Sequence, residues 1–290
     1  MLSIFRKKMW SDYTPLKVHS DSSLSILEKF PAKNAYNIVR NVLHSLRDIS
    51  KSLETQVDVD WCLDVLKYGL VCESSYSVDC VKIYCDWLSV LLPNQSSNIP
   101  KLIKNEANYM SRIMFKQIYK LFTTVNLSKP DPGLESACLK VFLTLENIGQ
   151  NSLTIEPATW EALLILLLGV TDLLLSPPGP GGHLCHSAAS VLCHTWMSAC
   201  CKNFPSPSLW KTFQSLATGW RHRIEMISHW STANLALLSK QLQFLYDPQF
   251  PRVQVDSCCS GLEVSMTNEV VAQTSYRFLH ILGNVVEISQ

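Results

Sequence analysis

Apolar side chains follow the helical repeat along most of the chain from residue 31 onward. Apolar residues three or four positions apart share one face of an α-helix. The segments 61–71 and 78–92 each carry two such stripes, which is typical of helices enclosed between neighbours. In the segment 34–53 the apolar positions that follow this spacing are Ala35, Ile38, Val39, Val42, Leu46 and Ile49.

Prolines and capping residues predict where several helices begin and end. Asp131 and Pro132 suit the cap and first turn of one helix, and Pro157 suits the start of the next. The sequence "SPPGPGG" at 176–182 cannot continue a helix and predicts a loop. The apolar run in "ALLILLLGVTDLLL" extends only from Ala162 to Val170, which is too short for a membrane span and predicts a buried helix.

The pattern predicts an all-α fold made of stacked antiparallel helices, an α-solenoid of HEAT or armadillo type. We expect a weakly ordered N-terminal arm at 1–30 and a helical array at 31–246, interrupted by the loop at 176–182. A loop at 247–267 and a terminal helix with a tail at 268–290 complete the predicted organisation.

Three evenly spaced tryptophans stand in the stretch 210–230, at Trp210, Trp220 and Trp230, and the basic triplet Arg221–His222–Arg223 follows the second. Aromatic rings among positive charges can bind single-stranded nucleic acid. The same residues can line the core of two helices joined by a polar turn. The tryptophans lie on or beside apolar stripes of two predicted helices, of which 224–246 has a wide apolar face, so the core interpretation is favoured.

Charge and cysteine usage narrow the class of protein. The chain has 25 Lys and Arg against 24 Asp and Glu, a net charge of +1, so it lacks the basic character typical of nucleic-acid binding. Its 11 cysteines are odd in number and irregularly spaced, and the first residues lack the apolar core of a signal peptide. We therefore expect reduced thiols and a cytoplasmic location, with no nucleic-acid partner.

Two clusters are candidate sites. Arg112, Lys116 and Lys120 form a basic ridge at helical spacing, which is usually a solvated face but could meet an acidic protein partner. A second cluster consists of histidines and cysteines, residue types that bind zinc, along one predicted helix. Together with Arg221–Arg223, it leaves open the alternative that the chain is a zinc- or nucleic-acid-binding helical module. Because its residues extend along a helix, they cannot enclose one ion without help from elsewhere. The members of this cluster are His183, Cys185, His186, Cys193, His194, Cys200 and Cys201.

No phosphate-binding loop, nucleophile elbow or metalloprotease motif occurs in the sequence. We therefore expect no catalytic residues, cofactor or small-molecule substrate.

Several segments resemble the N-terminal region of Ral GTPase-activating protein β subunits. These segments occur in the same order as in that family, and the resemblance spans about residues 30–288. They are "TWEALLILLLGVTDLLLSPP" (159–178), "PSPSLWKTFQSLATGWRHRIEMISHW" (205–230), "LQFLYDPQFP" (242–251) and "VAQTSYRFLHILGN" (271–284).

The resemblance implies a non-catalytic regulatory or scaffold role in a complex that accelerates GTP hydrolysis on Ral small GTPases. Members of the family form a heterodimer with a large catalytic α subunit, so an α subunit is the implied partner and Ral an indirect one. The family's GTPase-activating domain lies at the C-terminus, and no asparagine of this chain matches its catalytic position. The chain is accordingly expected to be a fragment, a short isoform or a truncated gene model.

Overall fold

The computed structural model describes residues 25–48, 53–126, 129, 131–152, 155–176, 182–247 and 266–282. Within these ranges all regular structure is helical, which confirms the predicted all-α class. Three short 3-10 helices, η1 (Ile26–Lys29), η3 (Ser89–Leu91) and η4 (Thr218–Trp220), accompany the α-helices. The α-helices are α2 (Ala32–Asp48), α3 (Gln56–Gly69), α4 (Ser74–Leu88), α5 (Lys101–Asn105), α6 (Ala107–Thr123), α7 (Pro132–Asn151), α8 (Pro157–Leu175), α9 (His183–Lys202), α10 (Pro207–Ala217), α11 (Ile224–Leu245) and α12 (Asn268–Leu279).

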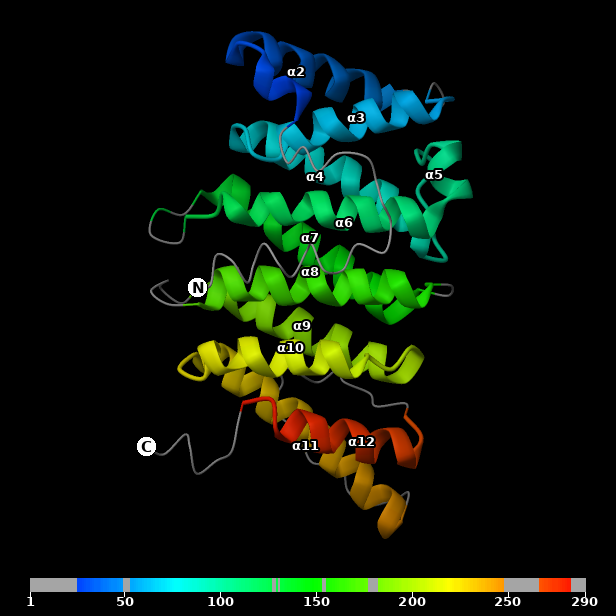
Figure 1. The fold of residues 1–290 in the computed structure, drawn as a ribbon, viewed down its shortest axis with the longest axis vertical. Coiled ribbons are helices and arrows are strands. Elements are labelled where there is room, and N and C mark those ends of the chain that lie inside the picture. Colours follow the sequence, from blue (N-terminus) through cyan, green and yellow to red (C-terminus); the bar gives the residue numbers. More distant parts are fainter. Residues whose placement is uncertain are drawn as a thin grey trace.

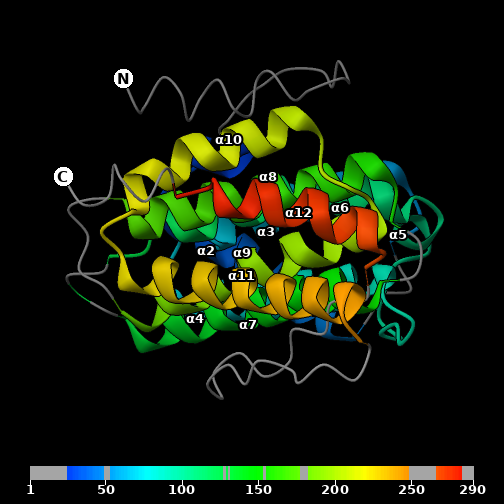
Figure 2. The same ribbon diagram turned by 90° about the horizontal axis from the view of Figure 1, so that it is seen from below.

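The helices stack in layers along the longest axis of the molecule, from α2 and α3 at one end to α11 and α12 at the other (Figure 1). Helices α3, α6, α8 and α10 pack successively on one side, and α4, α7, α9 and α11 pack successively on the other (Figure 2). Contacts between α8 and α9 join the two sides. Each inner helix therefore has neighbours on several faces, as the two-stripe segments predicted.

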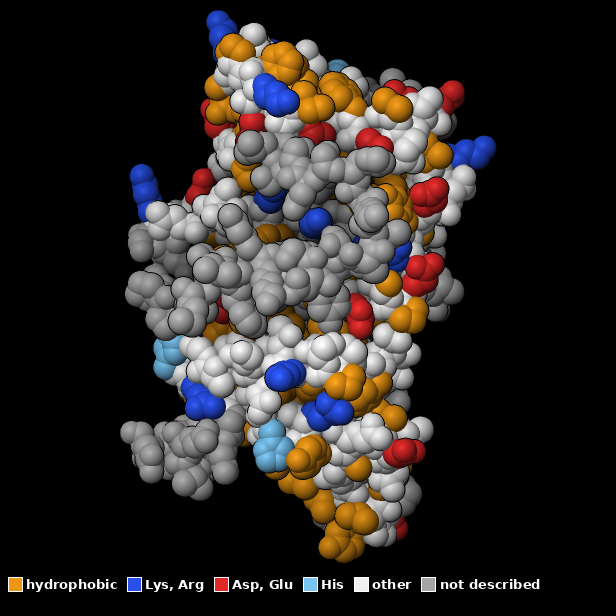
Figure 3. All heavy atoms as spheres, viewed as in Figure 1, with side chains coloured by type: hydrophobic (Ala, Val, Ile, Leu, Met, Phe, Trp, Pro, Cys, Tyr) orange, Lys and Arg blue, Asp and Glu red, His pale blue; other side chains and the backbone are white. Residues whose placement is uncertain are grey.

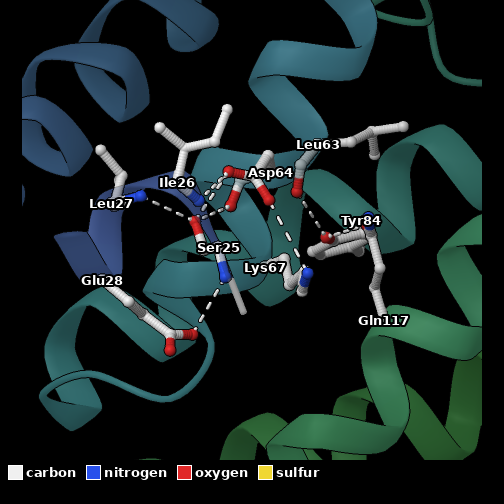
Figure 4. Close-up of polar contacts among 9 residues, drawn as sticks. All are labelled: Ser25, Ile26, Leu27, Glu28, Leu63, Asp64, Lys67, Tyr84 and Gln117. Atoms are coloured by element: carbon white, nitrogen blue, oxygen red, sulfur yellow. Dashed lines mark hydrogen bonds and ion pairs between the residues drawn. The ribbon is translucent and has the colours of Figure 1, made fainter. Parts of the chain in front are cut away.

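Residues 25–30, which the sequence assigned to the N-terminal arm, dock on α3. The Ser25 hydroxyl donates to the Asp64 carboxylate at 2.7 Å, and the Ile26 amide donates to the same oxygen at 3.0 Å (Figure 4). Ser25 and Glu28 also form a reciprocal capping box. The side chain of Leu27 is buried, so this short segment is attached to the core although most of its other side chains are exposed. The rest of the arm lies outside the described residues.

A buried tyrosine links the two sides of the stack near this end. The Tyr84 hydroxyl of α4 donates to the side-chain oxygen of Gln117 on α6 at 2.6 Å (Figure 4). Tyr84 is fully buried, and burial raises the pKa of its hydroxyl well above the usual value. The hydroxyl therefore remains a neutral donor, and the hydrogen bond satisfies it inside the core.

Helix α8 is the most enclosed element of the described structure. Fourteen of its nineteen residues are buried, including the continuous run Leu163–Asp172. By length and composition it is the one described helix that could cross a membrane, yet 78% of its apolar window is buried inside the protein. Packing against α6, α9 and α10 accounts for this composition, as predicted for a buried helix.

A polar contact inside the core fixes the C-terminal end of α8. The Asp172 carboxylate accepts from the Ser176 hydroxyl at 2.6 Å and from the Trp220 indole nitrogen at 3.2 Å. The Arg223 guanidinium donates to the carbonyl of Leu175 at 2.9 Å, which satisfies one of the last carbonyls of the helix. The turn after α10 is thereby tied to α8.

The tryptophan-rich stretch is part of the core. Trp220 is fully buried and Trp210 is 5% exposed. The Trp230 indole is half-buried and donates to the carbonyl of Phe278 on α12 at 2.6 Å. Arg223 is buried as well, so the basic triplet does not form a continuous exposed patch beside the rings. The core interpretation of the three tryptophans is confirmed.

Replacing Trp220 by alanine is expected to lower the free energy of unfolding by about 3–5 kcal/mol, because a large buried ring and its contact with Asp172 are lost. Urea unfolding followed by circular dichroism measures the change. Trp61 provides the matched control, because its side chain is 46% exposed, and Trp61→Ala is expected to cost less than about 1.5 kcal/mol. Equal costs for the two substitutions would contradict the core placement of Trp220.

Candidate functional site

The predicted basic ridge on α6 divides into residues with different roles. Arg112 is half-buried and donates to the Glu156 carboxylate at 3.0 Å and to the Thr159 hydroxyl at 2.8 Å. Asn108, one turn earlier, accepts the Glu156 backbone amide at 3.0 Å. These contacts attach α6 to the first turn of α8. Arg112 therefore has a structural task within the chain.

The other two members of the ridge lie closer to the surface. Lys116 is exposed, whereas Lys120 is half-buried. Burial lowers the pKa of Lys120, and the neighbouring positive charge of Lys67 lowers it further, while Glu28 and Asp64 act in the opposite direction. Lys116 is thus the member of the ridge that offers its charge most freely. Its role in partner binding stays a prediction.

The cysteines and histidines of α9 point in different directions. Cys185, Cys193 and Cys200 are buried in the core, whereas His183, His186 and Cys201 are exposed. Burial raises the pKa of Cys200 far above its usual value, so its thiol is a neutral group inside the core. Within the described residues, no three His, Cys, Asp or Glu side chains are placed to hold a metal ion. The geometry gives the zinc-binding alternative no support.

Instead, three histidines from two helices meet a glutamate from a third. His186 on α9 and His229 on α11 have ring centroids 4.6 Å apart, and the His194 ring lies 6.4 Å from that of His229. On its other side His194 contacts the Glu146 carboxylate of α7 through Nδ1 at 2.6 Å. We call these four residues the histidine cluster. It joins α7, α9 and α11.

Sequence reasoning missed two members of the histidine cluster, Glu146 and His229. Neither lies near His186 or His194 along the chain, and only the packing of three helices brings them together. Burial is the main cause that lowers the pKa of His229 from 6.5 to about 4, with smaller contributions from the nearby His186 and His194 and an opposing effect of Glu146. His229 is therefore neutral at neutral pH. In this state it packs between helices without the cost of a buried charge.

The apolar surface of α11 is the most exposed of the features that the sequence singled out. Its wide apolar face does not point to the core in the second half of the helix, where Leu235 is 36%, Leu238 46% and Leu245 74% exposed. The core side is formed by other residues, among them Met226, His229, Ala233 and Leu237. Apolar side chains gather on the surface at this end of the molecule (Figure 3). We call Leu235, Leu238, Leu242 and Leu245 the leucine seam.

The leucine seam departs from the expectation that the apolar face of a helix points to the core. The physical reason is that α11 packs on both α9 and α12, and its lower part extends beyond α12 (Figure 1), so no described helix covers the leucines there. The seam was visible in the sequence as leucines spaced by three and four positions. Which face of α11 is buried depends on the neighbouring helices, and the sequence of α11 alone does not contain that information.

In its described part the chain is therefore an all-α protein of packed helix pairs. Several of its polar side chains join helices, and the end of α11 presents an apolar surface. Comparisons with known proteins show what the chain is similar to. Residues 135–248 match the family model of the RALGAPB N-terminal domain. The chain is also 32% identical, over 301 aligned positions, to Ral GTPase-activating protein subunit beta from Homo sapiens and from Rattus norvegicus.

Each of these alignments covers 97% of this chain and 20% of the relative. The chain thus spans about one fifth of the length of the curated relatives it matches. None of the solved structures matches the chain. The resemblance found in the sequence is therefore confirmed: almost the whole chain is similar to Ral GTPase-activating protein β subunits, and the matched domain contains the tryptophan-rich stretch.

The histidine cluster should make the stability of the fold depend on pH. The folded-state pKa of His229 is lower than the unfolded value, so this contribution is fully present above about pH 6.5 and is lost as the pH falls toward 4. Between about pH 7 and pH 5 it amounts to about 2 kcal/mol of unfolding free energy.

Urea unfolding of the natural chain and of His229→Gln at both pH values measures this difference. Because the His194–Glu146 pair, His186 and the other titrating groups are common to both chains, their effects largely cancel in the comparison. The variant should lose about 2 kcal/mol less than the natural chain as the pH falls. Identical losses in the two chains would show that His229 is not held neutral between the helices.

Proposed function

We propose that this chain forms the non-catalytic scaffold region of a heterodimeric GTPase-activating complex that acts on Ral small GTPases. The observation that carries the proposal is the similarity, over 97% of the chain, to proteins described as Ral GTPase-activating protein subunit beta. The match of residues 135–248 to the RALGAPB N-terminal domain supports it as well. The proposed partner is the α subunit of such a complex. Ral would be an indirect partner, and the place of action would be the cytoplasm.

The arrangement of the helices fits a scaffold. We interpret the stack as an α-solenoid of HEAT or armadillo type, an architecture that offers long surfaces for protein contacts. In such a stack, partners would bind along the side formed by α3, α6, α8 and α10, along the side formed by α4, α7, α9 and α11, or at the end formed by α11. A large surface of this kind suits a subunit that holds another protein in place.

The charged side chains that make several hydrogen bonds hold helices together. They support a role in binding other proteins rather than a role in catalysis. The Lys202 ammonium donates to the carbonyls of Gly149, Gln150 and Ser152 at the end of α7. Asp172 and Arg223 fix the end of α8 in a comparable way. In the described part of the chain these charged groups join helices, and each of these contacts has a structural explanation.

Co-purification tests the proposal. The tagged 290-residue chain, co-expressed with an α subunit of a Ral GTPase-activating complex, is expected to retain that subunit through affinity and size-exclusion steps. Failure to retain it would contradict the scaffold proposal for this chain.

A charge reversal then tests the basic ridge separately. Lys116→Glu should weaken the binding of the α subunit by about fivefold, as expected for one exposed charge contact. Lys82→Glu is the matched control, because Lys82 is an exposed lysine of α4 outside the ridge. Equal effects of the two substitutions would remove the ridge from the contact surface while leaving the scaffold proposal intact.

A further inference from the structure

The leucine seam leaves a substantial apolar surface exposed. Its four leucines lie at spacings of three, four and three residues, which places them on one side of α11. Three of them are among the exposed large apolar residues of the described chain, and Leu242 is half-buried. The end layers of helical arrays usually carry polar outer faces that keep them soluble. An apolar outer face of this kind calls for a covering partner.

We propose that a second copy of this chain covers the seam. The two α11 helices would be antiparallel, and the two-fold axis that relates them would cross the seam at the level of position 240, midway between Leu238 and Leu242. The spacing of the leucines reads the same in both directions, so the seam is complementary to itself. Leu235 would pack on Leu245 of the partner subunit, and Leu238 on Leu242 of the partner subunit. Such pairing of like surfaces is what a two-fold interface requires.

The geometry of the seam matches a short coiled-coil contact. Leucines spaced by three and four residues occupy the a and d positions of a heptad, which form the contact between supercoiled helices. The lower part of α11 extends beyond α12 in Figure 1, and apolar side chains gather at this end in Figure 3. The described helices therefore leave the seam open to another chain.

The near absence of charged residues on α11 favours a second copy of the chain over a different partner that charge complementarity would select. From Met226 to Leu245 the sequence contains one Lys, Arg, Asp or Glu, namely Lys240. The Lys240 ammonium lies 5.3 Å from the centre of the Phe244 ring, at the helical position turned away from the seam. The neighbours of the seam, such as Asn234, Ser239 and Gln241, are uncharged. Two copies would thus meet without like-charge repulsion, whereas helices that select a different partner usually carry complementary charges beside the contact.

Sedimentation velocity over a range of concentrations tests the proposal on the full chain. The natural chain is expected to pass from a species of 32.7 kDa to one of twice that mass as the concentration rises. Leu238→Glu should weaken this association by at least about tenfold, because a charge would face an apolar partner side chain. Leu143→Glu is the matched control, since Leu143 is 67% exposed and lies on α7 rather than on α11, and it should leave the association unchanged.

Circular dichroism first establishes that each variant is folded. A natural chain that stays monomeric at every concentration would overturn the proposal and leave the seam to a different protein. A dimer of equal affinity in Leu238→Glu would overturn it too, because the contact would lie elsewhere. Neither result depends on whether an α subunit binds, so this test is separate from that of the proposed function.

Mixing two variants tests the antiparallel register. In the proposed dimer, residue 238 of each copy contacts residue 242 of the other, which gives two such contacts. When Leu238→Glu is mixed with Leu242→Lys, one of these contacts pairs opposite charges and the other pairs two leucines. The mixture is expected to associate at least about tenfold more tightly than either variant alone. No gain on mixing would overturn the antiparallel arrangement.

Discussion

The burial of α8 is the constraint on which the rest of the structure depends. A helix with the apolar run Leu163–Val170 is stable in water only when neighbours cover nearly all its faces, and α6, α9 and α10 supply that cover. Because α8 is enclosed by other helices, the polar groups at its two ends need hydrogen-bond partners from the rest of the protein. Contacts from Arg112 and Asn108 meet this need at its start, and those from Trp220 and Arg223 meet it at its end.

The features that follow from local spacing could be predicted from the sequence. The cap at Asp131, the start of α8 at Pro157, the burial of α8 and the core placement of Trp220 all follow from apolar periodicity and helix-end chemistry. The features that depend on several helices could not. The histidine cluster requires α7, α9 and α11 to be in register, and the exposure of the leucine seam depends on which face of α11 meets α9. The predicted loops at 176–182 and 247–267 lie mostly outside the described residues, because 177–181 and 248–265 are not described.

The polar chemistry of the chain and its exposed surfaces have separate tasks. Charged and aromatic polar groups that stand out in the sequence, including Arg112, Arg223 and His194, connect one helix to the next. The charge of Lys116 and the apolar leucine seam, in contrast, face solvent. This division fits the scaffold role proposed above, in which the surface of the helical stack contacts other proteins.

Hydrogen exchange followed by mass spectrometry tests most directly whether the stack is held by α8 and open at the seam. In a dilute sample of the chain, the amides of α8 should exchange slowest and those of residues 235–245 among the fastest of the helical amides. At high concentration the exchange of residues 235–245 should slow while that of α8 stays the same. If residues 235–245 exchanged as slowly as α8 in the dilute sample, the seam would already be covered within one chain, and an exposed binding surface at this end would be contradicted.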